Sequence, residues 1–105
     1  MTPLLPRRRF TADRRTCFRT VQARQSAAAA VRWEDATEDA LWALATSPSP
    51  APGHQAPDLG PPYRQVVFGT GRKPAYRIVF AVTPAGIELA ALRHLSQPDL
   101  APRDL

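Results

Sequence analysis

The sequence is poor in cysteine, in aromatic residues and in long apolar runs, and each shortage excludes a class of protein. Cys17 is the only cysteine, so the chain can form no internal disulfide and no thiolate metal site of the usual kind. The two histidines, His54 and His94, are too far apart in the sequence to suggest a pair of metal ligands. We therefore expect neither a metal nor a cofactor.

No apolar run approaches the ~20 residues that a membrane-spanning helix needs, and the first residues do not resemble a signal peptide. A chain of 105 residues has room for a single domain with a modest core. We expect a soluble, cytoplasmic protein without a membrane partner.

Positive charge is concentrated in the first quarter of the chain. Residues 1–24 hold seven arginines against Asp13 alone, a net charge of +6, whereas the remainder holds seven basic and eight acidic residues. A basic arm of this kind can bind the phosphates of nucleic acid, but arginine-rich runs are more often solvated and irregular. Because no clear apolar period is present, we expect residues 1–25 to be a basic, poorly ordered segment.

An amphipathic helix is predicted to follow this segment. Ser26 can cap it, and residues 27–45 contain neither glycine nor proline. We expect Trp33 to lie in the core, and Trp42, on the opposite side of the helix, to be exposed and available to a partner. The predicted buried stripe consists of Ala30, Trp33, Thr37, Ala40, Leu41 and Leu44.

Proline ends this helix and shapes the next segment. Residues 46–62 contain six prolines, which remove amide donors and fix φ, so neither a helix nor a central strand is expected there. The segment is predicted to be a mobile surface loop or an irregular crossover clamped at its ends. We assign no role to His54 within it.

Three strands are predicted after the loop, over residues 63–68, 76–82 and 87–94. The turn 83–86 joins the last two strands and places Gly86 where a positive φ is wanted.

The same turn sets the register of the last two strands. The predicted pairs are Val82 with Ile87, Phe80 with Leu89, Ile78 with Ala91, Arg77 with Leu92 and Tyr76 with Arg93. One face of the hairpin is then apolar and packs against the helix. The other face stays open to solvent, with Arg77 and His94 converging at one end.

The helix, the proline-rich loop and the strands "YRIVFAV" and "IELAALRH" resemble the RelE/ParE family of bacterial type II toxin–antitoxin toxins. The resemblance covers about residues 26–97, which we take as the toxin domain, and leaves 98–105 as a C-terminal tail. It implies an α+β fold: a small antiparallel sheet of three to four strands, with one or two N-terminal helices packed on one face. The family's first strand and helix should occupy residues 1–25, but this segment is rich in arginine and lacks an apolar alternation. We therefore expect a copy that is truncated or mis-started there.

The resemblance implies two kinds of activity. Members like RelE cleave messenger RNA on the ribosome, members like ParE inhibit DNA gyrase, and a cognate antitoxin silences both. In the nuclease branch, Arg77 would stabilise the phosphate in transfer and His94 would complete the catalytic site. The candidate residues for binding the target or nucleic acid are Arg64, Arg72, Lys73, Arg77 and Arg93.

Two departures from the nuclease pattern favour the activity of members like ParE over RNA cleavage. Gln97 stands near the position of a second nuclease arginine, and the tail "PDLAPRDL" contains no tyrosine. We therefore expect a toxin that binds a target such as DNA gyrase and is neutralised by a cognate antitoxin. A ribosome-dependent ribonuclease is one alternative, so whether the chain is an enzyme stays open. A small basic protein that binds nucleic acid through its N-terminal arm is another.

Overall fold

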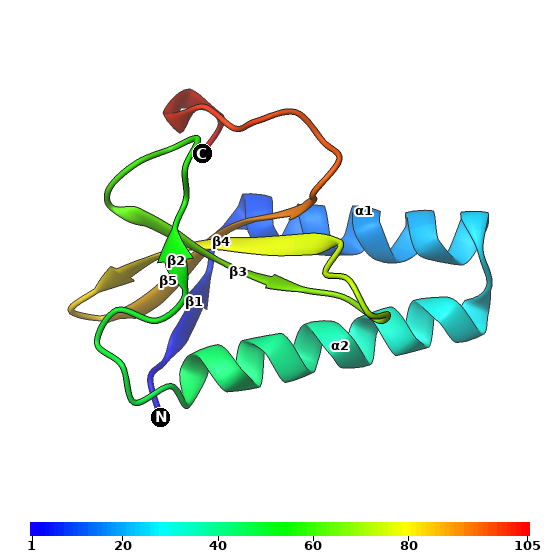
Figure 1. Ribbon diagram of the computed structural model, residues 1–105, viewed down its shortest axis with the longest axis horizontal. Coiled ribbons are helices and arrows are strands. Elements are labelled where there is room, and N and C mark those ends of the chain that lie inside the picture. The colour runs from blue at the N-terminus through cyan, green and yellow to red at the C-terminus, as the bar shows by residue number, and fades with distance from the viewer.

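The computed structural model describes residues 1–105 as a five-stranded sheet with two long helices (Figure 1). The sheet has the order β1-β5-β4-β3-β2, in which β1 runs parallel to β5 and all other neighbours are antiparallel. The predicted α+β class is confirmed, although the sheet is mixed and has five strands rather than three to four. The elements are β1 (Leu4–Pro6), α1 (Arg8–Arg24), α2 (Ala27–Ala45), β2 (His54–Gln55), β3 (Tyr63–Phe68), β4 (Tyr76–Thr83), β5 (Gly86–His94) and the short 3-10 helix η1 (Pro102–Asp104).

The N-terminal residues form regular structure, and the prediction of a poorly ordered segment over 1–25 is wrong. Residues 4–6 form an edge strand beside β5, and residues 8–24 form a helix that packs against α2 and β5. The first strand and helix of the family are therefore present, and the expectation of a truncated or mis-started copy is wrong. The apolar side chains of α1 that pack into the core are Phe10, Cys17, Phe18 and Val21.

Specific contacts of α1 explain how an arginine-rich sequence docks there. Arg14 Nε donates to Glu34 Oε1 at 2.7 Å, and its Nη2 bonds both Glu34 and Glu38 of α2. Asp13 Oδ2 accepts the backbone N–H of Leu92 at 3.1 Å. That N–H lies in the second half of β5, where the short β1 leaves the strand edge unpaired.

The main core lies between the helices and one face of the sheet. Ile78 and Phe80 of β4 are fully buried there, as the alternation predicted. Trp33 is also buried and meets the edge of the Tyr76 ring at 5.6 Å between centroids, whereas Trp42 is 61 % exposed. The buried position of Trp33 and the exposure of Trp42 are confirmed, whereas the contact of Trp42 with a partner stays a prediction.

The ends of α2 and the β4–β5 turn also follow the sequence. Ser26 Oγ accepts the backbone N–H of Ala29 at 2.9 Å and so caps α2. Gly86 has a φ of +147°, and a Cβ at this position would lie 2.5 Å from the carbonyl oxygen of Pro3. Glycine is therefore required at this position both by the backbone conformation of the turn and by the short distance to β1.

A β-bulge changes the register predicted for β4 and β5. Val82 opposite Ile87 and Phe80 opposite Leu89 are confirmed, but the register shifts between Val79 and Phe80. The pairs beyond the shift are Val79 with Ala91, Ile78 with Leu92, Arg77 with Arg93 and Tyr76 with His94, so the pairings predicted for these residues are wrong. The extra residue, Ala90, reverses the facing of the rest of β5, so Leu92 packs into the main core.

The second face of the sheet is covered by the chain itself, so the prediction of an open face is wrong. Residues 56–62 of the loop and the C-terminal segment lie side by side on the side of the sheet away from α2 (Figure 1). They enclose a small second core of Val79, Ala90, Ala91 and Leu100, against which Leu59, Tyr63 and Leu105 pack. The contacts of the loop with Arg64, Arg77 and Leu100 agree with the clamped crossover, and residues 54–55 within it form the edge strand β2. Neither helix has the length and apolar character required to span a lipid bilayer.

Candidate functional site

Arg77 lies on the covered face of β4, and its guanidinium is held by a carboxylate. Nη1 donates to Asp58 Oδ1 at 2.9 Å and Nη2 donates to Asp58 Oδ2 at 2.6 Å, a bidentate pair. Nη1 also donates to Gln65 Oε1 at 2.9 Å. The side chains of Arg77 and Asp58 are only 9 % and 5 % exposed. A guanidinium enclosed in this way offers little positive charge to a phosphate in solvent.

Asp58 joins three parts of the chain. Besides the pair with Arg77, its Oδ2 accepts the backbone N–H of Leu100 at 2.7 Å, which ties the C-terminal segment to the loop and to β4. The hydrogen bonds from Arg77 lower the pKa of Asp58 from 3.8 to about 2, although burial acts in the opposite direction. The carboxylate is therefore ionised at neutral pH, and the pair is a charged clamp.

His94 lies on the other face of the sheet, so the predicted convergence with Arg77 is wrong. The His94 ring meets Tyr76 edge-on at 4.9 Å, and its Nδ1 accepts the backbone N–H of Ser96 at 3.0 Å. Together with Cys17, it borders a cavity of about 370 Å³ between the end of β5 and α1. Burial raises the pKa of Cys17 to about 11, so the thiol is protonated at neutral pH and is a poor nucleophile.

Two of the other predicted cationic residues are used within the fold. Arg64 donates to the carbonyl oxygens of Pro52 at 2.9 Å, Gly53 at 3.1 Å and Ala51 at 3.2 Å, and so holds the start of the loop that leads to β2. Arg93, opposite Arg77 in the register, donates from Nη2 to the carbonyl oxygen of Pro98 at 2.7 Å.

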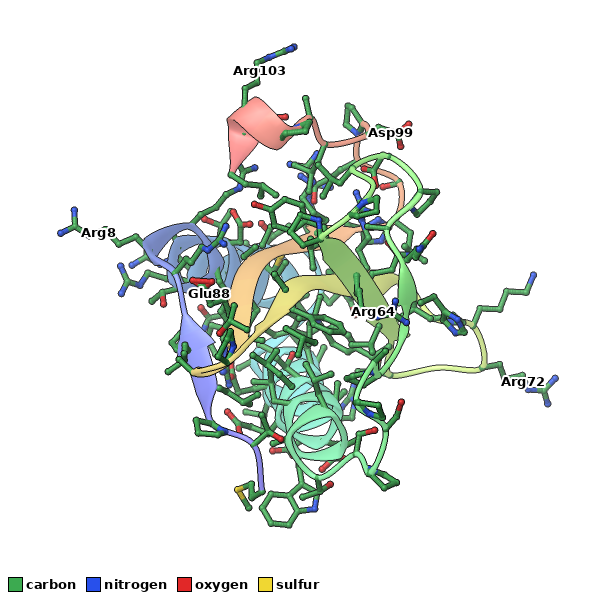
Figure 2. All side chains as sticks on the ribbon, turned by 90° about the vertical axis from the view of Figure 1, so that its left-hand side faces the viewer. Arg8, Arg64, Arg72, Glu88, Asp99 and Arg103 are labelled. Atoms are coloured by element: carbon green, nitrogen blue, oxygen red, sulfur yellow. The ribbon has the colours of Figure 1, made fainter.

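The remaining two predicted residues, Arg72 and Lys73, are exposed in the loop between β3 and β4, and Figure 2 shows Arg72 pointing away from the body of the protein.

The predicted nuclease residues are therefore not brought together. Cleavage of RNA needs cations and an acid–base pair around one phosphate. Arg77 is enclosed by Asp58 on one face of the sheet, and His94 lies on the other. Gln97, near the position of the second family arginine, accepts the backbone N–H of His94 at 2.8 Å and thus acts in the local turn.

Asp58 is the key residue that the sequence interpretation missed. It is the only acidic residue in the loop 46–62, and this was the one feature of the sequence that could have indicated a partner for Arg77. An arginine among the apolar residues of a strand needs a partner if it is buried, and Asp58 is the one carboxylate that the loop offers.

An apolar cavity offers a different kind of site. It has a volume of about 620 Å³ and opens between β1, the start of α1 and the end of α2. Leu4, Phe10 and Leu41 line it, together with the strongly exposed side chains of Met1 and Trp42. Large exposed apolar side chains around a cavity are typical of a surface that another protein covers.

The chain shares its fold with a chain of a solved structure described as "Chromosomal ParDE TA system from P. aeruginosa", with a TM-score of 0.74 over 91 % of this chain and 98 % of that chain. Only 14 % of the aligned residues are identical.

A family model described as "ParE toxin of type II toxin-antitoxin system, parDE" matches residues 4–98. The chain belongs to this family. The match begins at β1, so it includes the strand and helix that the sequence interpretation had set apart. No curated protein sequence matches the chain.

Proposed function

We propose that this chain is a growth-inhibiting toxin that acts in the cytoplasm by binding a target protein such as DNA gyrase. The observation that carries the proposal is the enclosure of Arg77 by Asp58. Its guanidinium is an internal clamp, and with His94 on the opposite face the RNA-cleaving alternative lacks an assembled site. The membership of the ParE family supports the same choice.

The exposed cations that remain fit a binding role. Arg72 and Lys73 stand on a loop at the end of the β3–β4 pair, where they can meet an acidic surface of a target without rearrangement of the fold. The predicted target-binding role of Arg64 and Arg93 stays a prediction. The contacts of both side chains with backbone carbonyls favour a structural role.

A cognate antitoxin is the second partner in this proposal. The apolar cavity beside Trp42 is the surface that we assign to it, because free toxin would otherwise leave Met1 and Trp42 in water at 83 % and 61 % exposure. An apolar segment of the antitoxin, inserted between β1 and α2, would bury both side chains.

The target is tested with the purified chain in two parallel reactions. Gyrase-dependent supercoiling of relaxed plasmid is expected to stop at toxin concentrations that leave a ribosome-dependent translation reaction, and the messenger RNA in it, intact. Loss of intact messenger RNA together with unaffected supercoiling would overturn the proposal. The matched control is Arg77→Lys, which removes the bidentate fork but keeps the charge. Provided that Arg77→Lys folds, it should inhibit supercoiling to the same extent as the parent chain.

A further inference from the structure

The outward face of α1 carries a row of arginines that the fold does not use. Arg8, Arg15 and Arg19 are all exposed, and none of them takes part in an ion pair. At 100° per residue, these positions lie within about 40° of one another around the helix, and the row spans about 16 Å along its axis. Figure 2 shows Arg8 pointing away from the body of the protein.

The neighbouring arginines are treated differently by the fold. Arg7 pairs with Glu88, Arg9 pairs with Asp13, and Arg14 bonds carboxylates of α2. The chain therefore supplies counter-charges to Arg7, Arg9 and Arg14, which flank the outer row. The outer row is left uncompensated, so it forms a continuous strip of positive potential.

The composition of this strip distinguishes between kinds of partner. The residues between and beside the arginines on the outer face are small or polar: Thr11, Ala12, Gln22 and Ala23. The face contains no acidic residue and no large apolar side chain, since the exposed large apolar residues all lie on other elements. Protein interfaces depend on buried aromatic and aliphatic anchors, whereas a phosphate backbone is held by arginine together with hydroxyl and amide groups.

We propose that the outward face of α1 binds the phosphate backbone of nucleic acid without reading its sequence. Each guanidinium presents a planar fork of donors that matches two phosphate oxygens. A straight row on one helix can follow one strand over several phosphates. The proposal does not rest on the identity of the toxin's target, because the row lies on a different element from Trp42 and from the β3–β4 loop.

The test measures binding of the full chain to a fluorescent 20-base-pair duplex, by anisotropy, over a series of salt concentrations. The variant Arg8→Gln/Arg15→Gln/Arg19→Gln is compared with Arg24→Gln/Arg32→Gln/Arg103→Gln. The control removes the same charge from exposed, unpaired arginines elsewhere. Melting curves verify that both variants fold. A single-stranded RNA of equal length and polyglutamate are the other two probes.

The variant of the outer row is expected to bind duplex at least about tenfold more weakly than the control variant at low salt. Its slope of log K against log [salt] should be shallower by up to about 2.7, because about 0.9 counterions are released for each phosphate neutralised. The probe that binds more tightly, duplex or single-stranded RNA, is the one whose phosphates the outward face of α1 prefers. Either preference supports the proposal. Equal losses in both variants, no binding by the parent chain, or competition by polyglutamate as strong as by duplex would overturn it.

Discussion

Replacing Asp58 with alanine is expected to lower the free energy of unfolding by about 3–5 kcal/mol, because the buried Arg77 guanidinium would lose its counter-charge. The side chains of both residues are almost fully enclosed, so water cannot replace the lost partner without opening the fold. The change also removes the acceptor for the Leu100 N–H, which holds the C-terminal segment. Urea denaturation followed by circular dichroism measures the effect.

The matched control for this variant is Asp99→Ala. Asp99 is exposed, lies next to Leu100, and makes neither a side-chain hydrogen bond nor an ion pair (Figure 2). Its replacement should change the free energy of unfolding by less than about 0.5 kcal/mol. If Asp58→Ala and Asp99→Ala were equally mild, the Asp58–Arg77 pair would contribute nothing to stability, and Arg77 would be free for another role.

The Asp58–Arg77 pair also makes the free energy of unfolding depend on pH in the acid range. The pKa of Asp58 is about 2 in the folded chain, against 3.8 for a free carboxyl group. Its stabilising contribution, about 2 kcal/mol, is therefore complete above pH 4 and is lost as the pH falls toward about 2. Asp58→Asn should lack this part of the pH dependence. If the free energies of unfolding of the parent chain and of Asp58→Asn changed with pH in the same way, this contribution of Asp58 would be ruled out.

Replacing Trp42 with alanine is expected to weaken binding of the antitoxin by about 2–4 kcal/mol, which is about 30- to 1000-fold in affinity. Trp42 lines the apolar cavity and is mostly exposed in the free chain, so the loss should appear in binding and not in folding. This prediction rests on the proposed antitoxin. The binding partner is the product of the adjacent reading frame that restores growth when it is co-expressed, and its affinity is measured by titration calorimetry.

Leu95→Ala is the control for the tryptophan variant. Leu95 is an apolar side chain of 45 % exposure that does not line the cavity. Its replacement should leave the affinity within about twofold of the parent value. Trp42→Ala with unchanged affinity, in a folded chain, would show that the antitoxin binds elsewhere, and the toxin proposal would then stand without this docking surface.

Local patterns in the sequence predicted a large part of the fold. Ser26 as a cap, Trp33 in the core and the alternation through Ile78 and Phe80 all depend on residues within a few positions of one another, and all are confirmed. The pairing of Val82 with Ile87 likewise followed from the short turn between them.

The errors arose where the deciding contact was distant or ambiguous. The sequence contains two adjacent alanines in β5, and either fits both faces of a sheet, so nothing local marked Ala90 as the extra residue of the bulge. In α1, arginines interrupt the apolar stripe, and their counter-charges come from residues distant in the sequence such as Glu34 and Glu88. The same holds for Asp58 and Arg77, which meet only after the loop has folded over the sheet.

In the function proposed above, Arg77 holds the fold together and takes no part in cleaving RNA. The direct test is growth inhibition by Asp58→Leu/Arg77→Met, in which an apolar pair replaces the buried ion pair. Its expected loss of stability is smaller than that of Asp58→Ala, because no buried charge is left unpaired and only the hydrogen bonds to Leu100 and Gln65 are lost. With folding verified by a melting curve, we predict that the induced double variant arrests bacterial growth as the parent chain does. A folded double variant that permits normal growth, beside a parent chain that arrests it, would contradict the purely structural role of Arg77 and return it to the candidate functional residues.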